Sequence, residues 1–136
     1  MIGLILVSHG VLGEVLLTTA TEIVGPLPHS GSLRIERHQA CDEIQTRLEQ
    51  EVEALNQGSG VLILADMFGG TARNISLKIV ETHQVEVVTG MNLPMLLKFS
   101  TERQQNTPLA ALAQLLRYYG QRNIMVAGDV LKEREL

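Results

Sequence analysis

The segment IGLILVSHG, residues 2–10, decides the fold of this chain. Its first six residues are apolar apart from Gly3, and they run into a polar turn. A continuous apolar run of this length is typical of a strand that is buried on both faces, as the strands of parallel sheets are. The segment therefore predicts a buried strand over residues 2–7, with a histidine at its carboxyl end.

The remainder of the chain alternates further apolar runs with helical patterns. Strands are expected at residues 33–35, 60–65 and 85–89, and a fifth apolar run covers residues 124–127. Between these runs, apolar residues recur every three or four positions, which is typical of amphipathic helices. Strands that alternate with helices predict one α/β domain over residues 1–136, with a doubly wound, mainly parallel four-stranded sheet flanked by helices.

The helical segments allow more detailed predictions. A helix is expected to begin at Asn92, whose side chain can cap it, with Pro94 in the first turn. The helix that starts at Thr107-Pro108 is expected to end just before Gly120. In the first helix of the chain, the residues expected to form the buried face are Leu12, Val15, Leu16, Thr19, Ala20 and Ile23.

The composition excludes several classes of protein. The 136 residues include 11 basic and 15 acidic side chains, and only 3% are aromatic. Nucleic-acid binding is not expected, since it needs cations for the phosphates and aromatic rings for the bases. No apolar run approaches the roughly 20 residues of a membrane span, and no signal peptide is recognised. Cys41 has no partner for an internal disulfide, which suits a reducing compartment, so we expect a cytoplasmic domain. The Cys41 side chain itself is expected to pack in the core.

Two chemically active residues follow strands that are expected to be neighbours in the sheet. His9 follows the first strand, and Asp66 follows the strand at residues 60–65. The functional crevice of such a sheet lies beyond the carboxyl ends of its strands, so the two side chains are expected to converge. The aspartate can accept a hydrogen bond from one ring nitrogen, which fixes the tautomer and leaves the other nitrogen free as a nucleophile.

The glycines near these two residues suit an anion. Gly10 allows a tight turn after the first strand, and Gly69-Gly70 allow close approach of the backbone to a ligand. Helix N-termini at these positions offer unpaired N–H groups to a phosphoryl group, and Thr71 can add a hydroxyl. The residues by themselves thus indicate a phosphoryl group that is carried on, or passed through, His9.

Each of these residues also has a simpler structural explanation. A histidine at a strand end can be structural, a glycine pair is an ordinary turn former, and Thr71 can be a plain N-cap. His38 and Cys41 have helical spacing, but two ligands are too few for a metal site, so no metal is expected. The chain has neither a Walker nor a Rossmann glycine pattern, so no nucleotide cofactor is expected.

Three motifs taken together resemble a known family. They are LILVSHG at residues 4–10, LADMFGGT at residues 64–71 and VVTGMNLPML at residues 87–96. In this order they are similar to the enzyme IIA component of the mannose family of the bacterial phosphoenolpyruvate-dependent sugar phosphotransferase system. The resemblance implies a phosphotransferase that takes a phosphoryl group from HPr and hands it to a sugar-specific IIB component, which serves a membrane IIC/IID permease.

The resemblance also implies roles for individual residues. His9 matches the phosphorylated nucleophile, with Nε2 as the reacting nitrogen, and Asp66 matches the carboxylate that orients it. The residues expected to hold the phosphoryl group are Gly10, Phe68, Gly69, Gly70 and Thr71, the last in place of the usual serine.

Members of this family form homodimers that exchange a C-terminal strand, and residues 124–127 are the segment that would be exchanged here. The chain departs from the family pattern at Ala72, where proline is common, and at Arg73, which adds a cation near the site. These departures leave the identity of the downstream partner open.

The sequence leaves other functions of the same phosphoryl chemistry open. A regulatory phospho-acceptor would use binding as its output, and a phosphotransfer subunit of a dihydroxyacetone kinase would pass the group to a bound cofactor product. A flavodoxin-like ligand binder with a structural His9 is a further alternative, which the scarcity of aromatic residues disfavours.

Overall fold

The structure is a computed structural model that describes residues 1–67 and 69–135. Along these residues, parallel strands alternate with helices, as the sequence predicts. In chain order the elements are β1 (Gly3–His9), α1 (Leu12–Val24), β2 (Ser30–Ile35), α2 (Cys41–Leu55), β3 (Val61–Ala65), α3 (Gly70–Thr82), β4 (Val85–Thr89), α4 (Leu93–Glu102), the short 3-10 helix η1 (Arg103–Gln105), α5 (Leu109–Arg122) and α6 (Ala127–Glu135).

The four strands form one sheet in the order β2-β1-β3-β4. All three strand pairs are parallel, and in β1 Val7 lies opposite Leu33 of β2 and Ala65 of β3. The predicted α/β fold with a four-stranded parallel sheet is therefore confirmed. Because the strands are parallel, the residues that follow β1 and β3 come out at the same edge of the sheet.

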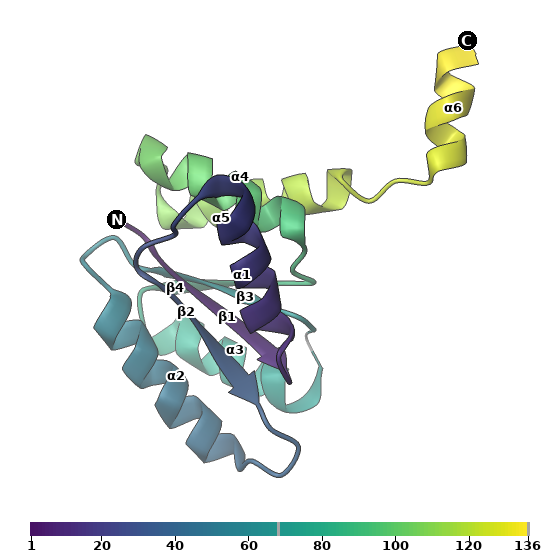
Figure 1. Cartoon of the computed structure of the whole chain (residues 1–136). Helices are drawn as coiled ribbons and strands as arrows, with labels where there is room; N and C mark the ends of the chain where they lie inside the picture. The colour runs from purple at the N-terminus through teal and green to yellow at the C-terminus, as the bar shows by residue number, and fades with distance from the viewer. Residues whose placement is uncertain (68, 136) are drawn as a thin grey trace.

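Helices cover both faces of the sheet, which makes a three-layer sandwich (Figure 1). On β1, Leu4 and Leu6 belong to the core cluster that α1, α4 and α5 cover, whereas Ile5 and Val7 belong to the cluster under α2 and α3. Successive residues of a strand point to opposite faces, so a strand covered on both sides must be apolar throughout. This requirement explains the uninterrupted apolar run at the start of the chain.

The predicted buried face of helix α1 is right in part, because Ala20 is buried and Leu16 packs against the core. Leu12, Val15 and Ile23 are exposed, while Gly13 and Ala20 are buried. A Cβ atom at Gly13 would lie 3.3 Å from Leu6 Cβ, so the helix begins in direct contact with β1. Gly13 allows this close approach, which leaves the three exposed residues of the predicted face in solvent.

The two helices after β4 agree with the sequence in part. Asn92 caps α4 as predicted, since its Oδ1 accepts a hydrogen bond from the Met95 N–H at 3.1 Å. The predicted end of the next helix is wrong, because α5 continues through Gly120 to Arg122. Gly120 is buried inside that helix, where it packs on Met95 of α4.

Two further expectations concern single segments. The apolar residues Ile124, Met125 and Val126 have no assigned strand, and they are exposed between α5 and α6. Helix α6 projects away from the rest of the molecule (Figure 1). Cys41 is exposed rather than in the core, because it is the first residue of α2 and the buried face of that helix starts at Ile44.

Candidate functional site

His9 and Asp66 meet at the carboxyl edge of the sheet, as the sequence predicts. His9 ends β1, and Asp66 follows β3 directly, with its N–H donating to the Val7 carbonyl at 3.2 Å. The Asp66 Oδ2 accepts the His9 backbone N–H at 2.9 Å and lies 3.0 Å from the His9 Nδ1. The Asp66 Oδ1 accepts the Met67 N–H at 2.8 Å. The carboxylate is therefore held by three contacts.

These contacts determine which ring nitrogen is available for chemistry. An ionised carboxylate only accepts hydrogen bonds, so in the neutral ring Nδ1 carries the proton and Nε2 keeps its lone pair. The His9 side chain is 55% exposed, while that of Asp66 is 15% exposed. The His9 ring can thus be reached by another macromolecule, while the carboxylate bound to it is largely shielded.

The Asp66 carboxylate stays ionised in this environment. Its partial burial raises the pKa, but the hydrogen bonds from the His9 backbone, the His9 ring and the Met67 backbone outweigh that effect and hold the pKa below the ordinary value of 3.8. A carboxylate fixed as an anion can orient an imidazole and stabilise the positive charge that grows on it.

The predicted glycines supply the turns around this pair. Gly10 has φ +57° and Gly70 has φ +51°, a region that residues with a Cβ rarely adopt. Gly69 is the N-cap of α3 and contributes no side-chain cap, and Thr71 is exposed in the first turn of that helix. An uncapped helix start has N–H groups that an anion can use. Phe68 lies outside the described residues.

The sequence prediction gives no role to Ser8, which lies between Val7 and His9. Its side chain is 1% exposed, and its Oγ accepts the Gly13 N–H at 2.8 Å. The signal that could have revealed it is a hydroxyl in a strand whose other inward residues are all apolar, because a buried hydroxyl needs hydrogen-bond partners.

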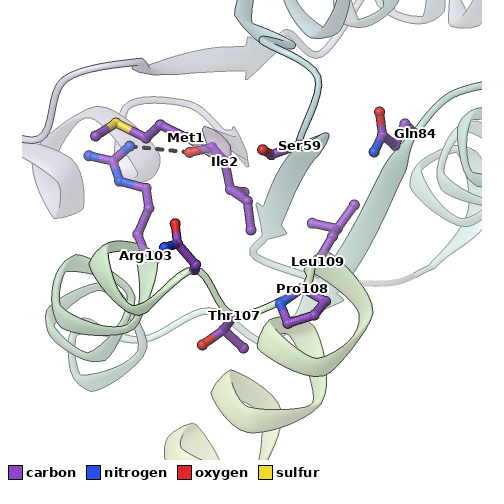
Figure 2. Close-up of a pocket in the computed structure, with 9 residues that line it drawn as sticks. Met1, Ile2, Ser59, Gln84, Arg103, Thr107, Pro108 and Leu109 are labelled. Carbon is purple, nitrogen blue, oxygen red and sulfur yellow. Dashed lines mark hydrogen bonds between the residues drawn. The ribbon is translucent and has the colours of Figure 1, made fainter.

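A cavity of about 320 Å³ lies at the amino ends of the strands, opposite the His9-Asp66 pair (Figure 2). It is lined by Ile2, Ser59 and Gln84, which precede β1, β3 and β4. Arg103 borders it and donates from Nη1 to the Ile2 and Pro28 carbonyls at 3.3 and 2.6 Å. Arg103 thus ties together chain segments at the amino ends of the strands, far from the His9-Asp66 pair.

Within residues 1–67 and 69–135, no group of three or more His, Cys, Asp or Glu side chains is placed to hold a metal ion. None of the helices described is long and apolar enough to cross a membrane.

Comparison with known sequences connects this geometry to a family. The model of the family described as "PTS system fructose IIA component" (EIIA-man) matches residues 3–116. The PTS system mannose-specific EIIAB component of Escherichia coli strain K12 is 27% identical over 115 residues, which are 84% of this chain and 36% of that protein. The PTS system fructose-specific EIIA component of Bacillus subtilis strain 168 is 25% identical over 134 residues, 98% of this chain and 91% of that protein. The chain thus spans little more than a third of the first relative.

Solved structures share the fold. The mannose/sorbose specific IIA subunit from Enterococcus faecalis superposes with a TM-score of 0.81 at 28% identity, over 92% of this chain and 93% of that one. The EIIA component from Streptococcus agalactiae gives a TM-score of 0.84 at 23% identity, over 95% and 99%, which is evidence for the fold alone. Together with the family match over residues 3–116, these findings confirm the resemblance of the three motifs: the chain belongs to the EIIA-man family of IIA components of the sugar phosphotransferase system.

Proposed function

We propose that this protein is a cytoplasmic phosphocarrier that accepts a phosphoryl group from HPr on His9 and passes it to a IIB component during sugar uptake. The observation that carries the proposal is the contact between Asp66 Oδ2 and His9 Nδ1. It leaves Nε2 as the free nitrogen of a half-exposed ring, at the edge of the sheet where a donor protein can reach it.

Transfer needs only the two imidazoles and the phosphoryl group. The Nε2 lone pair of His9 attacks the phosphorus of phospho-HPr, a new N–P bond forms, and the donor's N–P bond breaks with its electrons returning to the donor ring. The His9 ring becomes positively charged while Nδ1 keeps its proton, and the Asp66 carboxylate stabilises that charge. The second transfer repeats these steps with His9 as donor and the IIB component as acceptor.

The phosphoryl oxygens require donors while they reside on His9. We assign this role to the turn at Gly10 and to the start of α3, where Gly69, Gly70 and Thr71 offer N–H groups and a hydroxyl. Phe68 belongs to the same loop by sequence. Arg73, exposed in the first turn of α3, adds a positive charge on this side of the molecule.

We further propose that two copies form a homodimer by exchanging residues 124–127. Two features support this assembly: Ile124, Met125 and Val126 are exposed apolar residues, and β4 is an edge strand with an unpaired side. Exposed apolar segments and open strand edges are both features that proteins cover by association.

The proposed phosphorylation is tested by incubating the protein with labelled phosphoenolpyruvate, enzyme I and HPr. The expected result is an acid-labile label on wild type and on His38→Ala, a matched control at an exposed histidine, but none on His9→Ala. Phosphorus NMR of the labelled protein should place the phosphorus on Nε2. A His9→Ala variant that accepts label at the wild-type level would overturn the proposal.

A second step tests the acceptor. Labelled protein is mixed with candidate IIB components and separately with the subunits of a dihydroxyacetone kinase, and loss of label is followed in time. Transfer to a IIB component is the expected result. Transfer only to the kinase subunits, or to neither acceptor, would contradict a role in sugar uptake while leaving the phosphohistidine chemistry in place.

A further inference from the structure

Ser8 occupies an unusual position in β1, beside the proposed nucleophile. It is one of three polar or charged side chains that are buried in the described part of the chain, with Gln45 and Arg103. The rest of β1 that faces the helices is apolar, and a buried hydroxyl there is unfavourable unless it is hydrogen-bonded. The hydroxyl therefore needs a compensating structural role.

Both hydrogen-bonding capacities of this hydroxyl are used within the turn that follows His9. The Ser8 Oγ accepts the Gly13 N–H at 2.8 Å and lies 3.4 Å from the Gly10 carbonyl oxygen, to which it donates. Gly10 directly follows β1, and Gly13 lies in the first turn of α1. The Ser8 side chain thus bridges the turn by bonding to Gly10 and to Gly13.

The same contact caps helix α1. The N-cap residue Val11 has no polar side chain, and the first N–H groups of a helix lack partners inside the helix. Gly13 is the second residue of α1, so Ser8 acts as the capping acceptor from the preceding strand. A Cβ atom at Gly13 would lie 3.2 Å from the Ser8 Oγ, so a side chain at this position would crowd the hydroxyl.

His9 is thereby held on both sides. Its backbone N–H and ring are bound by Asp66, and the carbonyl of Gly10, the next residue, accepts from Ser8. Gly10 adopts φ +57°, so the chain reverses sharply directly after His9. If this turn relaxes, the Cα–Cβ bond of His9 and the helix start beside it both change direction.

We infer that Ser8 is a positioning residue for phosphoryl transfer: its hydroxyl fixes the β1–α1 turn, and through it the direction of His9 and of the N–H groups at the start of α1. The inference rests on the proposed function of His9. Ser8 touches no reacting atom in this role, so it acts on the rate of transfer rather than on the nature of the reaction.

The test compares Ser8→Ala with Ser30→Ala. Ser30 is a matched control, because its hydroxyl also donates to a backbone carbonyl from a strand, at the amino edge of the sheet. With phospho-HPr as donor, we expect kcat for labelling to fall about tenfold in Ser8→Ala with KM unchanged, since small displacements of a reacting group are costly. Ser30→Ala should label at the wild-type rate. Amide exchange at Gly13 should accelerate in Ser8→Ala alone.

Two more variants guard against a simple loss of fold. Ser8→Thr keeps the hydroxyl and should restore most of the rate, and Ser8→Cys keeps the size with a weaker hydrogen bond and should be intermediate. If folded Ser8→Ala or folded Ser8→Cys has the same kcat as Ser30→Ala, the inference is overturned, although the labelling of His9 stands. Absence of label on wild type would instead refute the proposed function.

Discussion

A single carboxylate oxygen, Asp66 Oδ2, accepts both the backbone N–H of His9 at 2.9 Å and the ring Nδ1 of His9 at 3.0 Å. These two donors are separated by the side-chain torsions χ1 and χ2. Joining them to one oxygen therefore fixes both torsions, and with them the direction of Nε2. Asp66 can therefore favour a reaction at Nε2 by holding the ring in one orientation, without itself forming or breaking a bond.

Replacing Asp66 by asparagine tests this orientation directly. Asp66→Asn keeps an acceptor oxygen of similar size but loses the charge that stabilises the imidazolium. We expect a folded protein in which labelling from phospho-HPr is slower by roughly 10²-fold. Asp42→Asn, an exposed change in the first turn of α2, should label at the wild-type rate. A folded Asp66→Asn protein with unchanged kinetics would remove Asp66 from the site.

Acid should weaken the fold through the same carboxylate. Partial burial raises the pKa of Asp66, but three hydrogen bonds outweigh it and hold the pKa below 3.8. A group with a lowered folded pKa stabilises the protein above its unfolded pKa, and this contribution is lost as the pH falls through the folded pKa. The free energy of unfolding should therefore exceed that of Asp66→Asn at about pH 5, and the difference should shrink towards about pH 3. Urea titrations of both proteins measure it, and a difference that does not change with pH would contradict the assignment.

The contact of α1 with β1 predicts that alanine affects the free energy of unfolding differently at two helical glycines. At Gly13, a Cβ would lie 3.2 Å from Ser8 Oγ and 3.3 Å from Leu6 Cβ, whereas at Gly128 in α6 nothing lies within 4 Å. Overpacking at Gly13 should cost about 1–3 kcal/mol, against a helix-propensity gain of about 1 kcal/mol. Gly13→Ala should lower the free energy of unfolding, while Gly128→Ala should leave it unchanged or raise it. Denaturant titration decides this, and equal effects of the two changes would argue against the close approach.

The proposed homodimer predicts a dependence on the segment after α5. At micromolar concentration, sedimentation should give twice the chain mass of 14.9 kDa. Val126→Glu places a charge in the exposed apolar run and should shift the protein towards monomer. Leu77→Glu, at an exposed apolar residue of α3, serves as the control and should stay dimeric. A wild-type protein that sediments as a monomer would exclude strand exchange.

The parts of this structure that the sequence predicts best depend on parallel strand order. His9 and Asp66 converge because each lies at the carboxyl end of a strand buried on both faces, and neighbouring parallel strands end on the same side of the sheet. The apolar runs identify such strands without further information. The cap at Asn92 is equally local, since it depends on residues within one helical turn.

Other features depend on contacts that no local pattern contains. Apolar spacing alone does not decide which residues of α1 are buried, because the contact of the small Gly13 with β1 leaves Leu12 and Val15 exposed. Glycine commonly marks the end of a helix, but Gly120 packs on Met95 and α5 continues past it. The role of Ser8 depends on a backbone N–H five residues away, across a turn.

The two hydrogen bonds between His9 and Asp66 join residues that are 57 positions apart in the chain. During synthesis, the histidine leaves the ribosome long before its carboxylate, and it acquires an oriented ring only when β3 has paired with β1. Under the proposed function, a wild-type rate of phosphoryl acceptance then reports that these two strands have paired. Label incorporation from the donor can accordingly serve as a folding assay that reads the centre of the sheet without an added probe.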